Sequence, residues 1–213
     1  MPSFTLPPQL IEHLNRGDCV LFVGDALDGV SPSAKLAAAL ADASGTHCEF
    51  CQEQGKCQRP NSCAVSLTRA AQMYEARNNR QALVDFVLHH IDNSTAPTPL
   101  HRALAALPVR VMITTAYDDR LHTALQEQKR AVWHVLRDEH VPFDDPTRVQ
   151  LIRLHGTLSQ PDSLVLTEDD TADLFSRLPV VTKILQGHIA NKTLLFVGYG
   201  LSDPHFLALY RQV

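Results

Sequence analysis

The sequence has no run of about 18 consecutive apolar residues, which a membrane-spanning helix requires. Its first residues, MPSFTLPPQL, lack the basic segment and apolar block of a secretory signal. Basic residues are not in excess either, since 19 Lys and Arg stand against 23 Asp and Glu, a formal net charge of -4. Without a basic run or a basic-aromatic stripe, nucleic-acid binding is disfavoured. We expect a soluble, cytoplasmic protein with no membrane contact.

Internal repeats, low-complexity stretches and long linkers are also missing. The chain has 213 residues, of which 45% are hydrophobic and 20% charged, enough for one domain with a sizeable core. We therefore expect a single domain over residues 1–213. The abrupt end after LALYRQV favours a domain taken from a longer protein, so we expect its partners to be other domains of that polypeptide or further copies of the chain.

Short apolar runs alternate with segments of helical period. Strands are expected at residues 19–23, 109–114, 131–136, 150–154, 164–167 and 193–198, and helices at 7–16, 32–43, 63–77, 81–91, 99–108, 117–127, 169–176, 179–189 and from 203. The strands are nearly continuous β-branched and leucine runs, which is typical of strands covered on both faces. The pattern predicts an α/β, Rossmann-like parallel sheet with helices on both faces.

Small and polar residues follow several of the expected strands. In such sheets ligands bind beyond the carboxyl ends of the strands, and a phosphate often meets free N–H groups at the start of a helix. The first such unit runs from strand 19–23 through Gly24 into a helix that begins after Ser31 and Pro32. However, Asp25 and Asp28 lie in this turn, where two carboxylates would repel an anionic ligand.

The motifs at these strand ends resemble a known family. FVGDALDG, ITTAYDD, LIRLHGTL with SLVLTEDD, and LLFVGYGLSDPHF resemble, in content and order, the sirtuin-like NAD-binding domains of bacterial antiphage proteins, of the silent-information-regulator type. The resemblance covers nearly the whole chain except residues 46–62. It implies a pocket for NAD or an ADP-ribose-type nucleotide, and an NAD glycohydrolase that depletes NAD after phage infection. The cofactor-binding positions it implies are Gly24, Asp25, Ala26, Leu27, Thr114, Thr115, Tyr117, Asp118, Gly198, Tyr199, Gly200 and Ser202.

Two of the motifs depart from the family pattern. Where the family has Gly-Ala-Gly-x-Ser, this chain keeps Gly24 but has Asp25, Ala26 and Asp28. A metal ion, an arginine such as Arg69 or Arg153, or a differently placed ligand would be needed to offset the charge of Asp25 near a pyrophosphate. Where the family has a catalytic asparagine in Thr-Thr-Asn-Tyr-Asp, this chain has Ala116. The loss of one such polar contact typically costs about 2.7 to 4 kcal/mol in the transition state.

The remaining two motifs keep the family residues. His155 matches the catalytic histidine, whose pKa suits a base beside the ribose hydroxyls or the attacking water. A histidine that only caps a strand is the alternative. The turn from Gly198 to Asp203 would offer N–H groups and the Ser202 hydroxyl to a ribose or phosphate, although Ser202 or Asp203 would also serve as a helix N-cap.

A cysteine-rich insertion is expected over residues 46–63. Cys48, Cys51, Cys57 and Cys63 form a C-x2-C-x5-C-x5-C pattern, which favours a four-thiolate zinc site that orders the loop. An iron–sulfur cluster is the second choice, since C-x2-C-x5-C also occurs in such proteins. Reduced, exposed thiols are the third, and His47 is a possible substitute ligand.

Two functions of different classes follow. The first is an NAD hydrolase that releases nicotinamide and ADP-ribose, with His155 as base. The second is a catalytically impaired relative that acts as a nucleotide sensor or assembly module, which the substitutions at Asp25, Asp28 and Ala116 favour.

Overall fold

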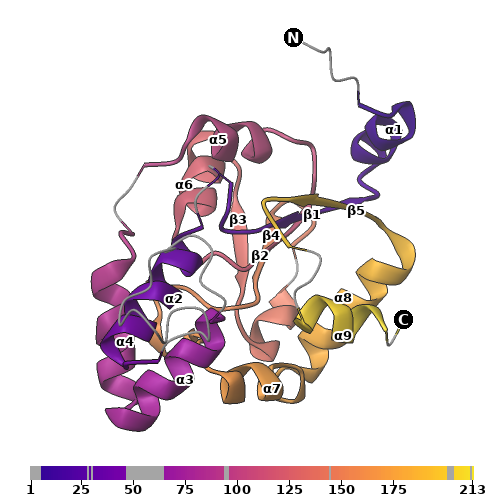
Figure 1. Ribbon diagram of the computed structural model, residues 1–213. Coiled ribbons are helices and arrows are strands. Elements are labelled where there is room, and N and C mark those ends of the chain that lie inside the picture. Colours follow the sequence, from indigo (N-terminus) through magenta and orange to yellow (C-terminus); the bar gives the residue numbers. More distant parts are fainter. Residues whose placement is uncertain are drawn as a thin grey trace.

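The computed structural model has a five-stranded parallel sheet at its centre (Figure 1). It describes residues 6–27, 29, 31–46, 65–93, 96–143, 145–200, 204–211 and 213. The strands are β1 (Cys19–Val23), β2 (Val111–Thr114), β3 (Val132–Val135), β4 (Val149–Arg153) and β5 (Thr193–Val197), in the order β3-β4-β2-β1-β5. The predicted Rossmann-like α/β class is confirmed.

One expected strand is wrong. Residues 164–167 are extended but pair with no strand, because their main-chain groups bond to side chains and to a turn instead. The amide of Val165 donates to the carbonyl of His155 at 3.1 Å, and the amides of Leu166 and Thr167 donate to the carboxylate of Asp170. A four-residue apolar run therefore forms an irregular segment, which becomes part of the site.

The strand register aligns four carboxyl ends at one edge of the sheet. Val23 at the end of β1 lies opposite Thr114 of β2 on one side and Val197 of β5 on the other. Thr114 in turn lies opposite Arg153 of β4. The chain order reverses at β1, which has β2 on one side and β5 on the other, and such a switch point is where α/β sheets bind ligands.

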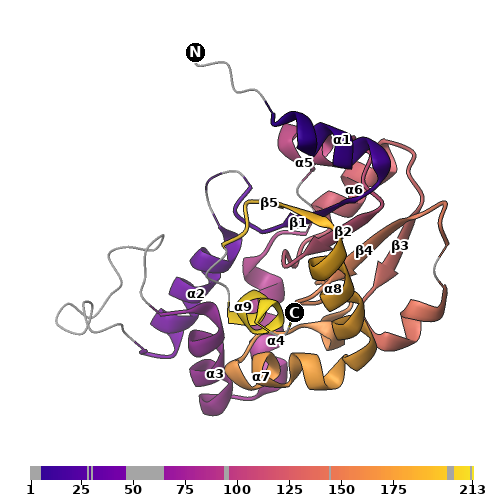
Figure 2. The ribbon, with the colours of Figure 1, turned by 90° about the vertical axis from the view of Figure 1, so that its right-hand side faces the viewer.

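Helices cover both faces of the sheet. Alternate residues of β1 show this, since Leu21 packs with α1 (Pro8–Arg16), α5 (Pro99–Ala105) and α6 (Arg120–Glu127), whereas Phe22 packs with α8 (Pro179–Asn191) and α9 (Pro204–Tyr210). Figure 2 shows α8 and α9 on one side of the sheet and α5 and α6 on the other.

A third group of helices packs beyond the carboxyl edge of the sheet. It consists of α2 (Pro32–Ala43), α3 (Leu67–Arg77), α4 (Arg80–His90) and α7 (Glu168–Arg177), and α2 to α4 share a core with Tyr117, Leu164 and Leu166. The helix α3 begins later than the predicted residue 63, because the Ser66 side chain caps it by accepting from the amide of Arg69. Short 3-10 turns at Asp138–Phe143 and Pro161–Ser163 complete the described elements.

The cysteine cluster falls outside the residues that the structure describes. Cys48, Cys51, Cys57 and Cys63 all belong to the part of the insertion at 46–63 that is not described. Asp28 and Ser202, elsewhere in the chain, are predicted site residues that are also not described. Within the described ranges, no group of three or more His, Cys, Asp or Glu side chains is arranged to hold a metal ion. No helix in those ranges is both long and apolar enough to cross a membrane.

Candidate functional site

A cavity of about 590 Å³ opens at the carboxyl edge of the sheet. Its volume lies within the range of about 300 to 1,000 Å³ that is usual for small-molecule sites. The lining residues are Gly24, Asp25, Ser33, Ser66, Leu67, Thr68, Thr115, Tyr117, His155, Val165, Glu168, Thr171, Gly198, Tyr199 and Gly200. The adjacent strands β4, β2, β1 and β5 are followed by His155, Thr115, Gly24 and Gly198, so four distant segments meet in one hollow.

One side of the cavity, which we call the glycine wall, consists of Gly24, Asp25, Gly198, Tyr199 and Gly200. Its two turns pack backbone against backbone, since the amide of Gly24 donates to the carbonyl of Val197 at 3.0 Å. A Cβ on Gly24 would lie 1.9 Å from the carbonyl oxygen of Gly198, which itself has φ +63°. Gly24 is therefore required by the contact between the two turns, whatever ligand the cavity takes.

The Tyr199 ring is fixed by an aromatic group behind the glycine wall. Its centroid lies 5.6 Å from that of Phe22, 5.9 Å from that of Phe196 and 6.3 Å from that of Phe206. Through Phe206, the helix α9 takes part in holding this wall. Such offset and edge-on ring contacts are each favourable by about 0.5 to 1.5 kcal/mol.

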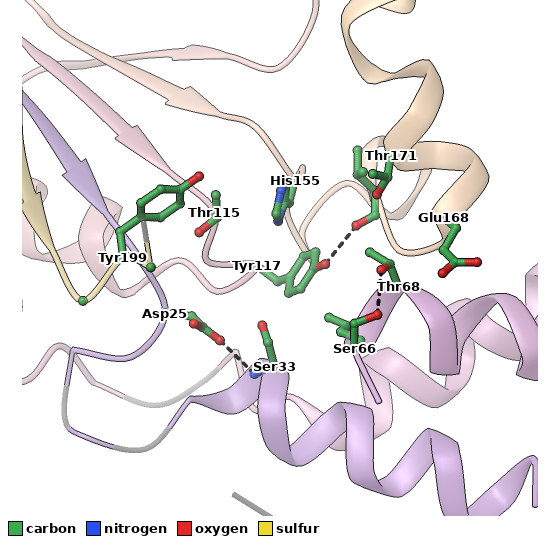
Figure 3. A pocket seen from close by; sticks show the side chains of 15 residues that line it. Asp25, Ser33, Ser66, Thr68, Thr115, Tyr117, His155, Glu168, Thr171 and Tyr199 are labelled. Carbon is green, nitrogen blue, oxygen red and sulfur yellow. Dashed lines mark hydrogen bonds between the residues drawn. The ribbon is translucent and has the colours of Figure 1, made fainter. Parts of the chain in front are cut away.

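The carboxylate of Asp25 caps the helix α2. Its Oδ2 accepts from the Ser33 amide at 2.8 Å, as Figure 3 shows. It also accepts from the Ser31 hydroxyl at 2.7 Å, and the Ser31 hydroxyl accepts from the Ala34 amide at 3.1 Å. Neither Arg69 nor Arg153, the arginines suggested as one way to offset this charge, pairs with Asp25. Arg69 pairs with Glu168 at 2.9 Å and Arg153 with Asp119 at 2.6 Å.

The opposite side, which we call the histidine wall, consists of Thr115, Tyr117, His155 and Val165. The buried Tyr117 hydroxyl donates to the Val165 carbonyl at 2.9 Å, and the Val165 amide donates to the His155 carbonyl at 3.1 Å. The His155 and Tyr117 rings lie 6.1 Å apart between centroids, and both side chains are drawn at the centre of Figure 3. Side-chain and main-chain hydrogen bonds thus fix where His155 stands.

Arg80, on α4, supports the histidine wall from outside the cavity. Its guanidinium donates to the Leu164 carbonyl at 2.7 Å and to the Asp170 carboxylate at 2.7 Å. Burial opposes ionisation of Asp170, but hydrogen bonds from the Leu166 amide, Arg80 and the Thr167 amide hold the pKa of Asp170 below its usual value. The same carboxylate forms a capping box with Thr167, which confirms the predicted helix start there.

A third side of the cavity was missed from the sequence. Ser66 and Thr68 come from the start of α3, and Glu168 and Thr171 come from the start of α7 (Figure 3). Within the described part of the structure, the buried Thr171 hydroxyl oxygen has no hydrogen-bond partner. The Ser66 cap was a readable signal for the start of α3, but no local pattern shows that α3 and α7 meet at the sheet edge.

Several predicted site residues lie beside the cavity without lining it. They are Ala26, Leu27, Thr114, Ala116 and Asp118, none of which is among the lining residues. The Thr114 hydroxyl accepts from the Ala116 amide at 3.1 Å, and this bond shapes the turn after β2. The buried Asp118 accepts from the Arg120 amide at 3.0 Å, so its carboxylate serves the start of α6.

A buried charged group lies below the histidine wall. The Arg153 guanidinium donates to the Asp118 carbonyl at 2.9 Å and pairs with Asp119. Burial opposes ionisation of Asp119. However, a hydrogen bond from Ser159, the charge of Arg153, and hydrogen bonds from Asn93 and Thr157 keep the pKa of Asp119 below its usual value. Burial, then the charge of Arg153, lowers the pKa of the nearby His134 from 6.5 to about 4.

The fold and the cavity together define a class of protein. A parallel α/β sheet whose switch point opens into a cavity, with glycine turns after β1 and β5, is the architecture of a Rossmann-like nucleotide-binding domain. A family model described as SIR2-like domain matches residues 110–213. The chain is similar to a SIR2-like domain over these residues and to bacterial defence proteins of the sirtuin type, so the resemblance seen in its motifs is confirmed.

Curated relatives support this assignment. The chain is 28% identical over 143 residues to the NAD(+) hydrolase ThsA of Acinetobacter baumannii, which covers 66% of this chain and 30% of the relative. It is 28% identical over 142 residues to the NAD(+) hydrolase ThsA of Bacillus cereus, which covers 65% of this chain and 30% of that relative. It is also 28% identical over 133 residues to the defense-associated sirtuin 2 of Bacillus subtilis, which covers 61% of this chain and 13% of that relative. The matched region thus spans at most about 30% of these relatives' length.

Proposed function

We propose that this domain binds NAD in the cavity and belongs to an NAD hydrolase that acts in bacterial antiphage defence. The observation that carries the proposal is the meeting of His155, Thr115 and the two glycine turns around one cavity of about 590 Å³. Relatives of 28% identity that are named NAD(+) hydrolase support it. The buried Thr171 hydroxyl, which lacks a partner among the described residues, is a further group that a bound ligand would satisfy.

The proposed reaction breaks the bond between nicotinamide and ribose. Nicotinamide leaves with the electron pair of that bond, and C1′ passes through an oxocarbenium-like state before the oxygen of water bonds to it. The proton of the water goes to His155, since an imidazole can act as a general base at neutral pH. The products are nicotinamide, ADP-ribose and one proton.

Each wall has a role in this proposal. The glycine wall and Ser202 hold the dinucleotide, with Ala26 and Leu27 shaping the first turn. The histidine wall places His155 beside the ribose, and Thr114 and Asp118 fix the turn that carries Thr115 and Tyr117. Ala116 stands where an asparagine would position the ribose and the water.

Nicotinamide release from NAD tests the proposal. We expect slow turnover by the protein and a gain of about 100- to 1,000-fold in the Ala116→Asn variant, because one preorganised polar contact is restored. His155→Ala should lower the rate by about 100-fold or more. His89→Ala, at an exposed position on α4, is the matched control and should keep the full rate. Equal rates in His155→Ala and His89→Ala would overturn the assignment of His155.

A second candidate function is a nucleotide sensor or assembly module without catalysis. Ala116 and the carboxylate of Asp25 motivate it, but the relatives named NAD(+) hydrolase do not favour it over the hydrolase. Calorimetric titration with NAD and ADP-ribose separates the two functions. Binding without turnover, in the protein and in Ala116→Asn alike, would support the sensor.

Three further proposals accompany the function. The first is that residues 1–213 form one domain, with the insertion at 46–63 held by zinc, or by an iron–sulfur cluster, at Cys48, Cys51, Cys57 and Cys63. Metal analysis of the purified protein distinguishes the two.

The second proposal is that other domains of a longer polypeptide, or further copies of the chain, are its partners. The third is a cytoplasmic location, where NAD is available.

A further inference from the structure

The carboxylate of Asp25 occupies the start of α2. In parallel α/β sheets this position receives a ligand phosphate on the free N–H groups of the helix. Here the first helical residue, Pro32, has no N–H, the Ser33 amide donates to the Asp25 carboxylate, and the Ala34 amide donates to the Ser31 hydroxyl. The first three residues of α2 therefore leave no amide for a phosphate.

The side chain that fills this position also faces the cavity. Asp25 is half-buried, lines the cavity and has only neutral donors, Ser31 and Ser33, as hydrogen-bond partners among the described residues. The other lining carboxylate, Glu168, is paired with Arg69. Among the described residues that line the cavity, none is a lysine or an arginine. A phosphate that approached the glycine wall would thus meet a negative charge, with no lysine or arginine among the described lining residues to offset it.

We propose that Asp25 is a specificity-determining residue, which weakens binding of ligands that carry a diphosphate relative to N-ribosyl ligands that lack one. The inference rests on the proposed NAD pocket and deepens it. Like charges in a partly desolvated cavity repel more strongly than in bulk water, so the carboxylate acts against NAD and ADP-ribose. Nicotinamide riboside, which has a positive ring and no phosphate, escapes this repulsion.

The variant Asp25→Asn isolates the charge from the cap. Asparagine keeps a side-chain oxygen that can accept from the Ser33 amide and from the Ser31 hydroxyl, and Ser31 remains the N-cap residue. The helix α2 should therefore remain capped and the protein folded. Asp42→Asn is the matched control, since it removes one negative charge from an exposed position near the end of the same helix.

Calorimetric titration of both variants and the parent protein with NAD, ADP-ribose and nicotinamide riboside is the test. We expect Asp25→Asn to tighten binding of NAD and ADP-ribose by about 10- to 100-fold and that of nicotinamide riboside by less than about 3-fold. The gain should shrink between low and high salt, and Asp42→Asn should change none of the three.

The outcomes separate this inference from the proposed function. Equal gains for all three ligands, no gain, or weaker NAD binding in Asp25→Asn would overturn the role of Asp25 while leaving the NAD pocket in place. If none of the three ligands binds to any variant, Ala116→Asn included, the NAD pocket itself is wrong. Thermal unfolding of each variant, expected to match the parent, shows that the comparison concerns folded protein.

Discussion

The glycine wall is held by main chain packed on main chain, whereas the histidine wall is held by hydrogen bonds that reach it from distant helices. At the glycine wall, Gly24 and Gly198 lie too close for any Cβ on Gly24. At the histidine wall, Tyr117, Val165 and Arg80 form a chain of polar contacts that ends at His155. The glycine wall should therefore tolerate no added atom at Gly24. At the histidine wall, the loss of each single hydrogen bond should lower stability by a smaller amount.

This difference also explains where the two walls accept change. At the glycine wall, Asp25 and Ala26 stand where the usual motif has other residues, and the amide of Gly24 still donates to the Val197 carbonyl. At the histidine wall, Ala116 removes a polar group, yet Thr114 still shapes its turn through the Ala116 amide. The contacts that hold both walls are therefore present in a chain whose polar groups differ from those of the usual motifs.

The largest expected effect comes from adding one methyl group to the glycine wall. Gly24→Ala should lower the free energy of unfolding by about 3 kcal/mol or more, because the new Cβ would meet the Gly198 carbonyl at 1.9 Å. Gly187→Ala is the control: this glycine lies inside α8 with nothing within 4 Å of the new Cβ. That variant should gain about 0.5 to 1 kcal/mol. Denaturant unfolding checks both, and equal stability would contradict the close contact.

Removing the outer support of the histidine wall should have a smaller effect. Arg80→Met leaves the partly buried Asp170 carboxylate without its cation and the Leu164 carbonyl without its donor. We expect a loss of about 1 to 2 kcal/mol in the free energy of unfolding and weaker NAD binding. Arg77→Met, at an exposed position on α3, should change neither. Unaltered NAD affinity in Arg80→Met would show that His155 does not depend on this support.

The charged group below the histidine wall should make stability depend on pH. The unfolded His134 takes up a proton near pH 6.5, but the folded one does so only near 4, so the unfolded state binds more protons between these values. The free energy of unfolding should therefore fall as the pH drops through this window. After an allowance for solvent screening, we expect a fall of about 1 to 2 kcal/mol from His134.

His134→Gln sharpens this prediction, because it removes the titrating group. Its unfolding free energy should change less than that of the parent between about pH 6.5 and pH 4.5, a range above the acidic titration of Asp119 and Asp170. His89→Gln, at an exposed position, should keep the slope of the parent. The same slope in His134→Gln would contradict the lowered pKa of His134.

The smallest expected effect is the loss of one hydrogen bond. Tyr117→Phe removes the donor to the Val165 carbonyl and should lower the free energy of unfolding by about 1 kcal/mol. Because the Phe ring keeps the packing beside His155, nicotinamide release should fall only a few-fold. A loss as large as that from Gly24→Ala would mean that the two walls do not differ as described.

Local patterns in the sequence predicted most of the fold. Five of the six expected strands exist, and Ser31 and Thr167 cap α2 and α7 as ordinary cap chemistry requires. The apolar run at 164–167 gave a wrong strand prediction, because its main-chain groups bond to the side chains of Arg80, Tyr117 and Asp170. Arg80 and Tyr117 lie far away in the chain. The periodicity of apolar residues gives no information on such long-range contacts.

The site was predicted in part for the same reason. Residues directly after β1, β2, β4 and β5 had to meet at one edge of a parallel sheet, and the lining residues Gly24, Thr115, His155 and Gly198 do so. The residues contributed by α3 and α7 depend on how helices pack beyond that edge, which no local motif specifies. The capping role of Asp25 was likewise missed, since it needs the exact path of the turn before α2.

The central claim is that both walls contact one bound nucleotide. NMR titration of labelled protein with ADP-ribose tests it directly, with the amides of Gly24 and Gly198 and the imidazole of His155 as probes. Signals from the two walls should shift together and give a single dissociation constant. Shifts confined to one wall, or shifts elsewhere with both walls unchanged, would contradict it.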